Sequence, residues 1–314
     1  MPTAGHSVLR GIAQVALSAS PWSGLLFTAG LFAANWRFGL FALLGAAAST
    51  AAAAVLGADR GGLAQGLEGY CGCLTALALV VRLGASWRTA LLATVAGVLC
   101  AVVAAACARL LGRIGLPSLT APFCLVAGVL TTVLPAGAPV PAAPAPRTGF
   151  TGLTVGELAD AFCDNIGQVF FLDTWYAAPI LLAGLLAASR KAAAAAVCGS
   201  AVAILTACAL GLPAERISEG RYGYNAVLVA LALGATFLPV TAWTVGYAVL
   251  AVVFSVPLTV AWSASVEPSG GSALTWPFVV TTWVFLAAAP ALNRMTGAAA
   301  HTAPCPTPAK PPPR

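Results

Sequence analysis

Apolar residues follow one another along most of this chain without the alternation that marks a half-exposed strand. The stretches FGLFALLGAAASTAAAAVLG (38–57) and AVCGSAVAILTACALG (196–211) are rich in Ala and Leu, which favour helix. Strands of a membrane barrel would instead alternate polar and apolar positions over about ten residues. The pattern therefore predicts apolar helices.

Each half of the chain contains five apolar segments, several of them shorter than the ~20 residues of a full membrane crossing. The segments are predicted at 22–34, 38–57, 72–83, 88–112 and 118–134 in the first half, and at 176–188, 192–211, 225–237, 240–262 and 273–293 in the second. A Gly-rich stretch, 61–69 or 215–223, precedes the third segment of each half and is expected to enter the membrane as a half-helix.

Short strings of the first half recur in the second at a nearly constant offset. Gln14 within GIAQV matches Gln168 within NIGQV, an offset of 168 − 14 = 154 residues. Tyr70 and Tyr224 follow similar Gly-containing strings at the same offset, and the string LTAPF at 119–123 returns as LTWPF at 274–278. Biased composition explains recurring Ala and Leu but not recurring Gln, Tyr and Thr-x-Pro-Phe.

Five crossings are an odd number, so the second copy must enter the membrane from the opposite side. We therefore predict an all-α membrane protein with about ten transmembrane helices and two re-entrant half-helices, built as two inverted-topology repeats around a central pathway. The predicted parts are a first repeat at 1–134, a Pro/Ala linker at 135–149, a second repeat at 150–300 and a disordered cytoplasmic tail at 301–314. Basic residues number nine on the inner side and six on the outer in this arrangement, which favours cytoplasmic termini.

The composition agrees with a chain whose surface faces lipid. Hydrophobic residues make up 60% and charged residues 8%, with a mean hydropathy of +0.93, whereas a soluble domain carries roughly 25% charged residues. The net charge is +6, yet no basic run exceeds two residues. Membrane lipids, and not nucleic acid, are thus the expected partners.

Carboxylates and imidazoles, the side chains that most often transfer protons, are absent from the middle of the apolar segments. The nine acidic residues lie at the segment ends or between them, and the two histidines, His6 and His301, lie in the tails. A proton relay, a base beside a nucleophile and an ATP-binding loop are therefore not predicted, and neither is an enzyme. Cys71 and Cys73 lack partner ligands, so we expect no metal or cofactor. A pathway for a neutral solute remains.

The recurring strings together resemble the urea transporter family, from Gly11 to about Leu292. The strings that carry the resemblance are Gly11-Ile-Ala-Gln14-Val, Gly66-Leu-Glu-Gly-Tyr70, Leu116-Pro-Ser-Leu-Thr-Ala-Pro-Phe123, Gln168-Val-Phe-Phe171, Tyr222-Gly-Tyr-Asn-Ala-Val-Leu228 and Leu274-Thr-Trp-Pro-Phe278. The resemblance implies a homotrimer in a bacterial inner membrane, with one urea pore per protomer and a three-part selectivity filter.

The resemblance also implies which residues line that filter. Two glutamines would stand at the wider mouths, two side chains three residues later would form slot walls, two leucines would form the opposite walls, and two threonines would mark the narrow midpoint. In that order the residues are Gln14 and Gln168, Leu17 and Phe171, Leu74 and Leu228, and Thr120 and Thr275. Backbone carbonyls near the half-helices would form two ladders of oxygen atoms.

Such a filter suits urea, which is flat and neutral with N–H donors along its edges. Apolar walls fit its faces, while oxygen atoms replace its lost water bonds one at a time. An unpaired polar group in a dry site costs roughly 1–3 kcal/mol. An ion pays far more to lose its water, so uncharged dipoles cannot admit it.

Two departures from the family pattern leave other cargoes open. The first slot wall is usually aromatic, but here it is Leu17, and Tyr70-Cys71 stands where the second half has Tyr224-Asn225. We therefore predict passive, channel-like diffusion of urea, with short amides, ammonia or water as alternative cargoes. A membrane scaffold subunit without a pore is the alternative from another class.

Overall fold

The computed structural model describes residues 4–134, 152–292 and 294. The predicted linker at 135–149 and tail at 301–314 lie outside these residues. The described part of the chain is helical, with fourteen α-helices and short 3₁₀ or π segments. The α-helices are α1 (Ala4–Gln14), α2 (Pro21–Ala34), α3 (Trp36–Val55), α4 (Arg60–Gln65), α5 (Tyr70–Leu83), α6 (Trp87–Gly112), α7 (Ala121–Val133), α8 (Val155–Gly167), α9 (Ala177–Ala188), α10 (Arg190–Ala209), α11 (Ala214–Ser218), α12 (Tyr224–Leu231), α13 (Ala242–Val266) and α14 (Trp276–Ala288).

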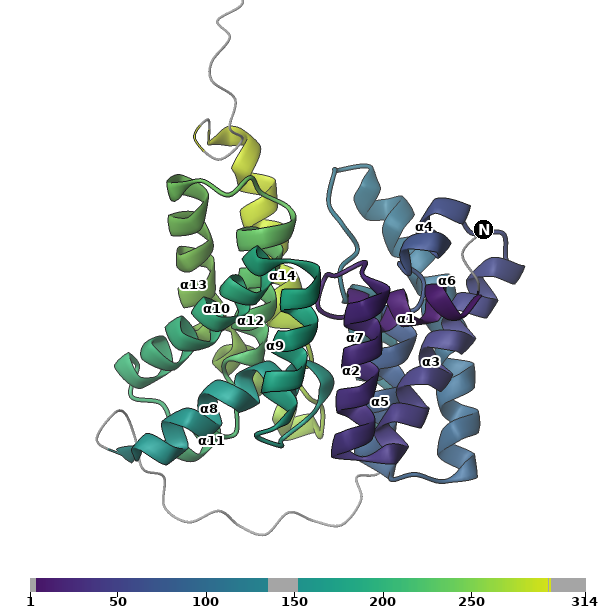
Figure 1. Cartoon of the computed structure of the whole chain (residues 1–314), viewed down its shortest axis with the longest axis horizontal. Helices are drawn as coiled ribbons and strands as arrows, with labels where there is room; N and C mark the ends of the chain where they lie inside the picture. The colour runs from purple at the N-terminus through teal and green to yellow at the C-terminus, as the bar shows by residue number, and fades with distance from the viewer. Residues whose placement is uncertain (1–3, 135–151, 293, 295–314) are drawn as a thin grey trace, which may run out of the picture.

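The helices form two bundles that lie side by side, α1–α7 on the right and α8–α14 on the left of Figure 1. They meet where α2 packs against α9 and where α7 contacts α14. The Ser23 hydroxyl donates a hydrogen bond of 2.7 Å to the Gly184 carbonyl across this boundary. The rings of Phe27 and Phe170 pack with centroids 5.3 Å apart. The buried core is therefore continuous between the bundles.

Polar side chains fix where several helices begin. Ser20, Asn35, Ser86 and Ser189 each accept a hydrogen bond from a backbone N–H in the first turn of the helix that follows. Such caps satisfy donors that have no partner inside the helix, which matters most where water is absent. Asn35 and Ser189 occupy positions 154 residues apart, so the third and tenth helices begin at matching places.

Left-handed residues end the helices at matching places as well. Gly57, Gly66 and Gly115 have positive φ in the first bundle, and Gly211, Gly220 and Gly270 have it 154 or 155 residues later. Glycine adopts this conformation without steric cost and commonly closes a helix. Four larger residues share it, again at those offsets: Leu17 with Phe171 and Leu119 with Leu274.

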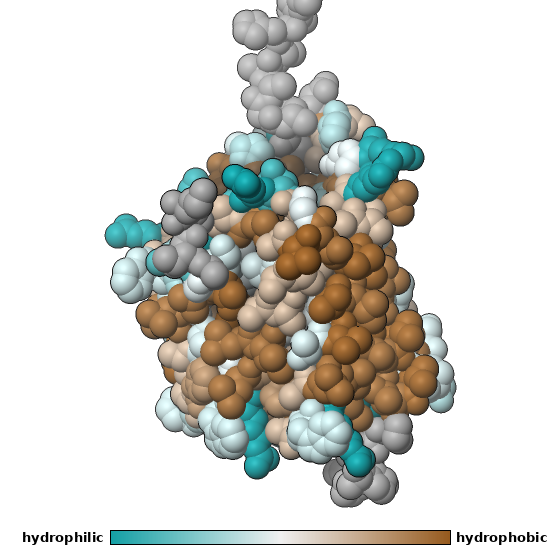
Figure 2. Space-filling model, turned by 90° about the vertical axis from the view of Figure 1, so that its right-hand side faces the viewer, coloured by the Kyte–Doolittle hydropathy of each residue, from teal (hydrophilic) through white to brown (hydrophobic). Residues whose placement is uncertain are grey.

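Four helices are long and apolar enough to cross a membrane: α3, α6, α10 and the segment from Ala242 to Ser269 that contains α13. Six shorter apolar helices accompany them. Figure 2 shows apolar side chains gathered in a broad band, with hydrophilic groups above and below it. Large apolar side chains such as Trp87 (73% exposed) and Leu91 (59% exposed) would be unfavourable in water on this scale. The prediction of an all-helical integral membrane protein is confirmed.

Each predicted apolar segment contains a helix, but the pattern missed three features. Helices α1 and α8 are amphipathic and not wholly apolar, so they were not among the predicted segments. The Gly-rich stretches hold only short helices, α4 with six residues and α11 with five. Helix α12 passes into a π-helix at Ala232–Thr236, where the sequence predicted one uniform segment.

Candidate functional site

Thr120 and Thr275 meet at the boundary between the two bundles. Their hydroxyl oxygens lie 2.6 Å apart, and both residues are buried. The sulfur of Cys124 lies 3.1 Å from the Thr275 hydroxyl and forms a second possible partner for it. The two residues that the sequence placed at a common midpoint, 155 positions apart, are thus in direct contact.

The bonding of this pair differs from that of other buried threonines in the chain. Thr28, Thr75 and Thr131 each donate to the carbonyl four residues earlier in their own helix, at 2.7–2.8 Å. This back-bonding is the ordinary behaviour of a threonine in a membrane helix. Thr120 and Thr275 instead sit just before α7 and α14 and bond across the boundary. Their hydroxyls are therefore directed at one another by the fold.

A matched brace holds each threonine in place. The preceding residues, Leu119 and Leu274, have φ values of 48° and 47°. Their carbonyls each accept a hydrogen bond of 2.5 Å from a tyrosine hydroxyl, Tyr70 for the first and Tyr224 for the second. A left-handed non-glycine residue costs roughly 1–2 kcal/mol, so these bonds stabilise a conformation that the backbone would otherwise leave.

A cavity of about 550 Å³ lies on the side of the pair that Thr120 faces. Gln14 and Leu17 line it, together with the aromatic ring of Phe278 from the other bundle. The Gln14 side-chain amide donates to the Gln65 carbonyl at 3.1 Å, which leaves its own oxygen directed elsewhere. Three of the predicted filter residues, Gln14, Leu17 and Thr120, therefore share one cavity.

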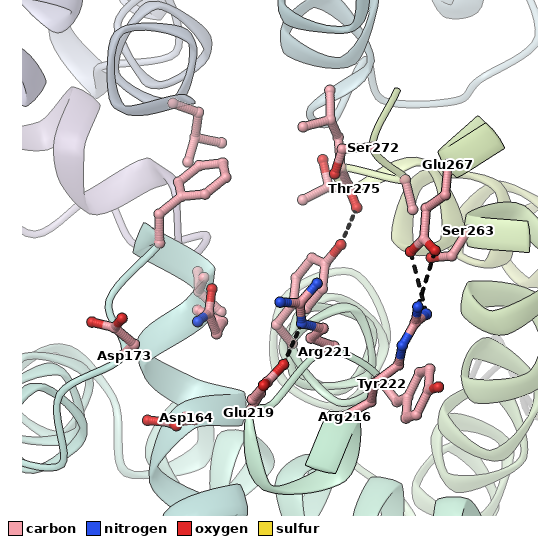
Figure 3. A pocket seen from close by; sticks show the side chains of 17 residues that line it. Asp164, Asp173, Arg216, Glu219, Arg221, Tyr222, Ser263, Glu267, Ser272 and Thr275 are labelled. Atoms are coloured by element: carbon pink, nitrogen blue, oxygen red, sulfur yellow. Dashed lines mark hydrogen bonds and ion pairs between the residues drawn. The ribbon is translucent and has the colours of Figure 1, made fainter. Parts of the chain in front are cut away.

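A second cavity of about 410 Å³ lies on the Thr275 side (Figure 3). Gln168, Phe171 and Leu74 line it with Thr275, so Leu74 from the first bundle stands in the same cavity as Phe171 from the second. The ring of Phe171 packs edge-on against Phe123, with centroids 6.3 Å apart. Four further filter residues are thus brought together.

Leu228 is the remaining predicted wall. It is buried, at 1% exposure, and does not line either of these two cavities. Its counterpart Leu74 is equally buried yet borders the second cavity. The role of Leu228 as a wall stays a prediction.

Leu17 and Phe171 owe their placement to the way α1 and the short helix after α8 end. The Ser18 N–H bonds back to the Ala13 carbonyl at 3.2 Å, and the Leu172 N–H bonds to the Gly167 carbonyl at 3.1 Å. The residue before each of these donors is left-handed, where six other turns of the described chain have glycine. A large side chain is therefore retained at both cavities despite its conformational cost.

The same turns free backbone oxygen atoms beside the cavities. In the described part of the chain, no backbone N–H outside the regular helices donates to the carbonyls of Val15 and Ala16, or to those of Val169 and Phe170. Val15 and Val169 line the first and second cavity, respectively. These oxygens are available as acceptors for a molecule that donates N–H groups.

Charged residues also line the second cavity, and the sequence analysis did not place them there. Asp164, Asp173 and Glu219 are three of them, and Figure 3 shows how they lie. Arg216 forms an ion pair with Glu267 at 3.2 Å, and Arg221 forms one with Glu219 at 2.5 Å. The signal in the sequence was the concentration of acidic residues at 157–173 and 215–219, which periodicity alone could not locate in space.

The crowding of carboxylates changes the proton affinity of one of them. Burial, together with the neighbouring charges of Asp173, Asp160 and Glu219, raises the pKa of Asp164 from 3.8 to about 6, and burial is the largest cause. At the first cavity, partial burial raises the pKa of Glu68, with a smaller contribution from Asp59. Both groups lie outside the apolar helices.

The chain matches a known family over most of its length. Residues 6–290 match the family described as urea transporter. The chain belongs to the urea transporter family. Urea transporter 1 of Ovis aries is 27% identical over 289 residues, which cover 89% of this chain and 75% of that protein. Urea transporter 1 of Capra hircus and of Rattus norvegicus have the same identity and coverage.

Membership of the urea transporter family confirms the resemblance seen in the sequence, and the family is one of transporters. The sequence analysis still missed the part that two aromatic residues play. Phe123 and Phe278 served there as markers of the Thr-x-Pro-Phe strings, whereas Phe278 lines the first cavity and Phe123 packs on Phe171. The recurrence of the string was the available signal for both.

Proposed function

We propose that this protein is a passive, channel-like pathway for urea across a membrane. The observation that carries this function is the contact between the uncharged side chains of Thr120 and Thr275, with one cavity on each side of it. Seven of the eight predicted filter residues border the two cavities that meet at this contact. Gln14 and Gln168 stand in the wider parts, and the threonines form the narrow midpoint.

A urea molecule in either cavity meets apolar faces and acceptors at its edge. Phe171 and Leu74 flank the second cavity, and Leu17 and Phe278 flank the first. The free carbonyls beside Val15 and Val169 accept N–H bonds from the solute, which offsets the loss of water. At the midpoint the threonine hydroxyls separate, and each accepts from or donates to the passing molecule. Ions find no charge there to repay their desolvation.

The proposed architecture is a pair of inverted repeats with ten crossings. The ten apolar helices and the matching left-handed residues at offsets of 154 and 155 support two copies of one unit. The sequence analysis placed the half-helices at 61–69 and 215–223, where the structure has only the short helices α4 and α11. In their place we assign the half-helices to α1 and α8. The eleven residues of α1 rise about 16 Å at 1.5 Å each, about half the ~30 Å hydrocarbon layer. The homotrimer, the inner-membrane location and the cytoplasmic termini complete the proposal.

Urea flux into proteoliposomes tests the function directly. Vesicles placed in an inward urea gradient shrink as water leaves and re-swell as urea enters; the re-swelling should be faster with protein than without it, and should not respond to an imposed pH gradient. Accumulation of urea against its gradient, driven by protons, would contradict a passive pathway. Equal re-swelling kinetics with and without protein would instead favour the scaffold alternative.

A second cargo class follows from the aliphatic wall at Leu17. A leucine leaves more room beside a flat solute than the aromatic ring that Phe171 provides in the other cavity. Acetamide, formamide and methylurea should therefore compete with urea for the first cavity. The order of their inhibition constants in the flux assay separates a urea pathway from a general amide pathway.

A further inference from the structure

An apolar groove of about 300 Å³ opens on the surface of the second bundle and shares no lining residue with the two cavities of the pathway. It runs between α10, the π-helix after α12, and α13. Small residues form its floor and walls, including Ala194, Ala195, Cys198 and Gly234. Ala194 and Cys198 are exposed, so the groove is accessible from the surroundings of the protein.

The groove has a charged end. Lys191 is the charged residue among those that line it, and no carboxylate lines it. Arg190 precedes Lys191 at the first turn of α10, and both are exposed. In the described part of the chain, neither forms an ion pair. The N-terminal end of α10 adds its partial positive charge at the same place.

The groove also has the length of one lipid chain. From Lys191 to Val202 along α10, eleven residues rise about 16 Å at 1.5 Å each. This is about half of the ~30 Å hydrocarbon layer, and so about one leaflet. Trp243 is the second residue of the neighbouring α13, and Arg294 lies over its ring at 4.2 Å. Tryptophan and arginine at this level are typical of the boundary between headgroups and hydrocarbon.

The first bundle lacks these features at the matching positions. There, 154 residues earlier, Arg37 occupies the place of Lys191, but Leu40 and Leu44 replace Ala194 and Cys198. Helix α5 continues as a regular helix to Leu83. In the second bundle, the matching helix widens into the π-helix that contains Gly234. The groove is therefore a specialisation of one bundle and not a result of the repeated fold.

We propose that this groove binds one acyl chain of an anionic phospholipid, whose phosphate is held by Lys191 and Arg190. The apolar slot takes the chain, and the two cations neutralise the headgroup. Basic pockets between membrane helices recognise anionic headgroups in this way. A zwitterionic lipid of the same chain length also enters the slot, but it gains less from the two cations because its own ammonium group offsets the charge of its phosphate.

Native mass spectrometry of the whole protein in a mild detergent tests the assignment. Phosphatidylglycerol should remain bound at lower added concentration than phosphatidylcholine with the same acyl chains. Lys191→Gln should weaken phosphatidylglycerol binding about fivefold, since one basic group near a headgroup is worth about that factor. Arg37→Gln is the matched control, and it should leave binding unchanged because its surroundings lack the slot.

Filling the slot tests the acyl chain separately from the charge. Ala194→Leu with Cys198→Leu copies the first bundle and should abolish the preference for phosphatidylglycerol while both cations remain. These positions are exposed, and the melting temperature in lipid-free detergent reports whether the fold is kept.

Three outcomes would overturn the assignment. The first is equal retention of phosphatidylglycerol and phosphatidylcholine, and the second is an equal loss of phosphatidylglycerol in Lys191→Gln and Arg37→Gln. The third is a variant with both leucines that still binds phosphatidylglycerol but no longer forms the oligomer. That result would make the groove an interface between copies of the chain. None of these measurements depends on urea flux, so the lipid site and the conducting function fail independently.

Discussion

The two threonines at the midpoint are held by unequal surroundings. Tyr70 and Tyr224 brace them identically, but the next residue differs. Asn225 accepts from the Phe278 N–H at 3.2 Å and donates to the Leu274 carbonyl at 3.4 Å. In the first bundle, the Cys71 sulfur lies 3.9 Å from the corresponding carbonyl. A thiol is a weak donor, so the Thr275 side is the more firmly fixed of the two.

The two cavities also differ, and the one beside Thr275 again has the more rigid surroundings. The second is bordered by the ring of Phe171 and by ion pairs at its outer end, whereas the first has Leu17 and is mostly apolar. The backbone conformations are repeated almost exactly, down to φ values of 57° at Leu17 and 59° at Phe171. The repeated backbone thus sets the positions, and side-chain differences give the two ends separate properties.

The largest effect is expected from removing the hydroxyl on the firmly fixed side. Thr275→Val keeps the shape but removes one of the two midpoint hydroxyls, which lie 2.6 Å apart. A polar group of the solute left unpaired at this point costs roughly 1–3 kcal/mol, so urea flux should fall by about tenfold or more. Thr275→Ser should retain most of the flux, and Thr131→Val, which loses only a bond within its own helix, should change little. Equal losses in Thr275→Val and Thr131→Val would remove the pair from the pathway.

The next largest effect is expected from exchanging the two wall residues between the cavities. Leu17→Phe should make the first cavity resemble the second and reduce methylurea flux relative to urea by several-fold. Phe171→Leu should do the opposite, because a pocket discriminates by roughly 10-fold or more per methylene-sized difference when it fits closely. The ratio of methylurea to urea flux in proteoliposomes measures both. Identical ratios in the two variants and the native protein would show that neither side chain borders the solute.

The smallest effect concerns charge at the second cavity. The pKa of Asp164 is raised to about 6 from 3.8, so its contribution to stability is complete below 3.8 and is lost as the pH rises through 6. Asp164→Asn cannot ionise and should therefore melt at a higher temperature than the native protein at pH 7.5. The difference should be a few degrees at most, because the group is partly exposed. It should shrink towards pH 5; a difference independent of pH would contradict the shift.

The sequence was sufficient for features that depend on repeated polar residues in an apolar background. The recurrence of Thr120, Thr275, Gln14 and Gln168 in matched strings singled them out, and the resemblance to the family implied their place in the filter, which stays a prediction. Apolar periodicity also located the helices that form the bundles. It could not locate α1 and α8, since an amphipathic helix of eleven or thirteen residues lacks a continuous apolar run.

Features that depend on contacts between distant segments could not be predicted from the sequence. The charges beside the second cavity come from α8 and the segment that follows it, from α11 and the turn after it, and from the residue that follows α13, and only the folded chain brings them together. The π-helix at Ala232–Thr236 is a second example, because nothing in the residues ALGAT distinguishes it from a regular turn. Leu228 is a case in which the sequence could not decide between two roles. A leucine in an apolar helix can line a pathway or pack in the core, and its residue type does not distinguish the two.

The left-handed leucines and phenylalanine have a consequence for attempts to make this protein more robust. Glycine at 17, 119, 171 or 274 would relieve the backbone, so a selection for heat resistance should favour it. Such variants would be easier to purify and crystallise, yet the narrowest parts of the route would lose the side chains that shape them. A variant selected only for a higher melting temperature can therefore lose transport selectivity, and these four positions should be kept unchanged in such a selection.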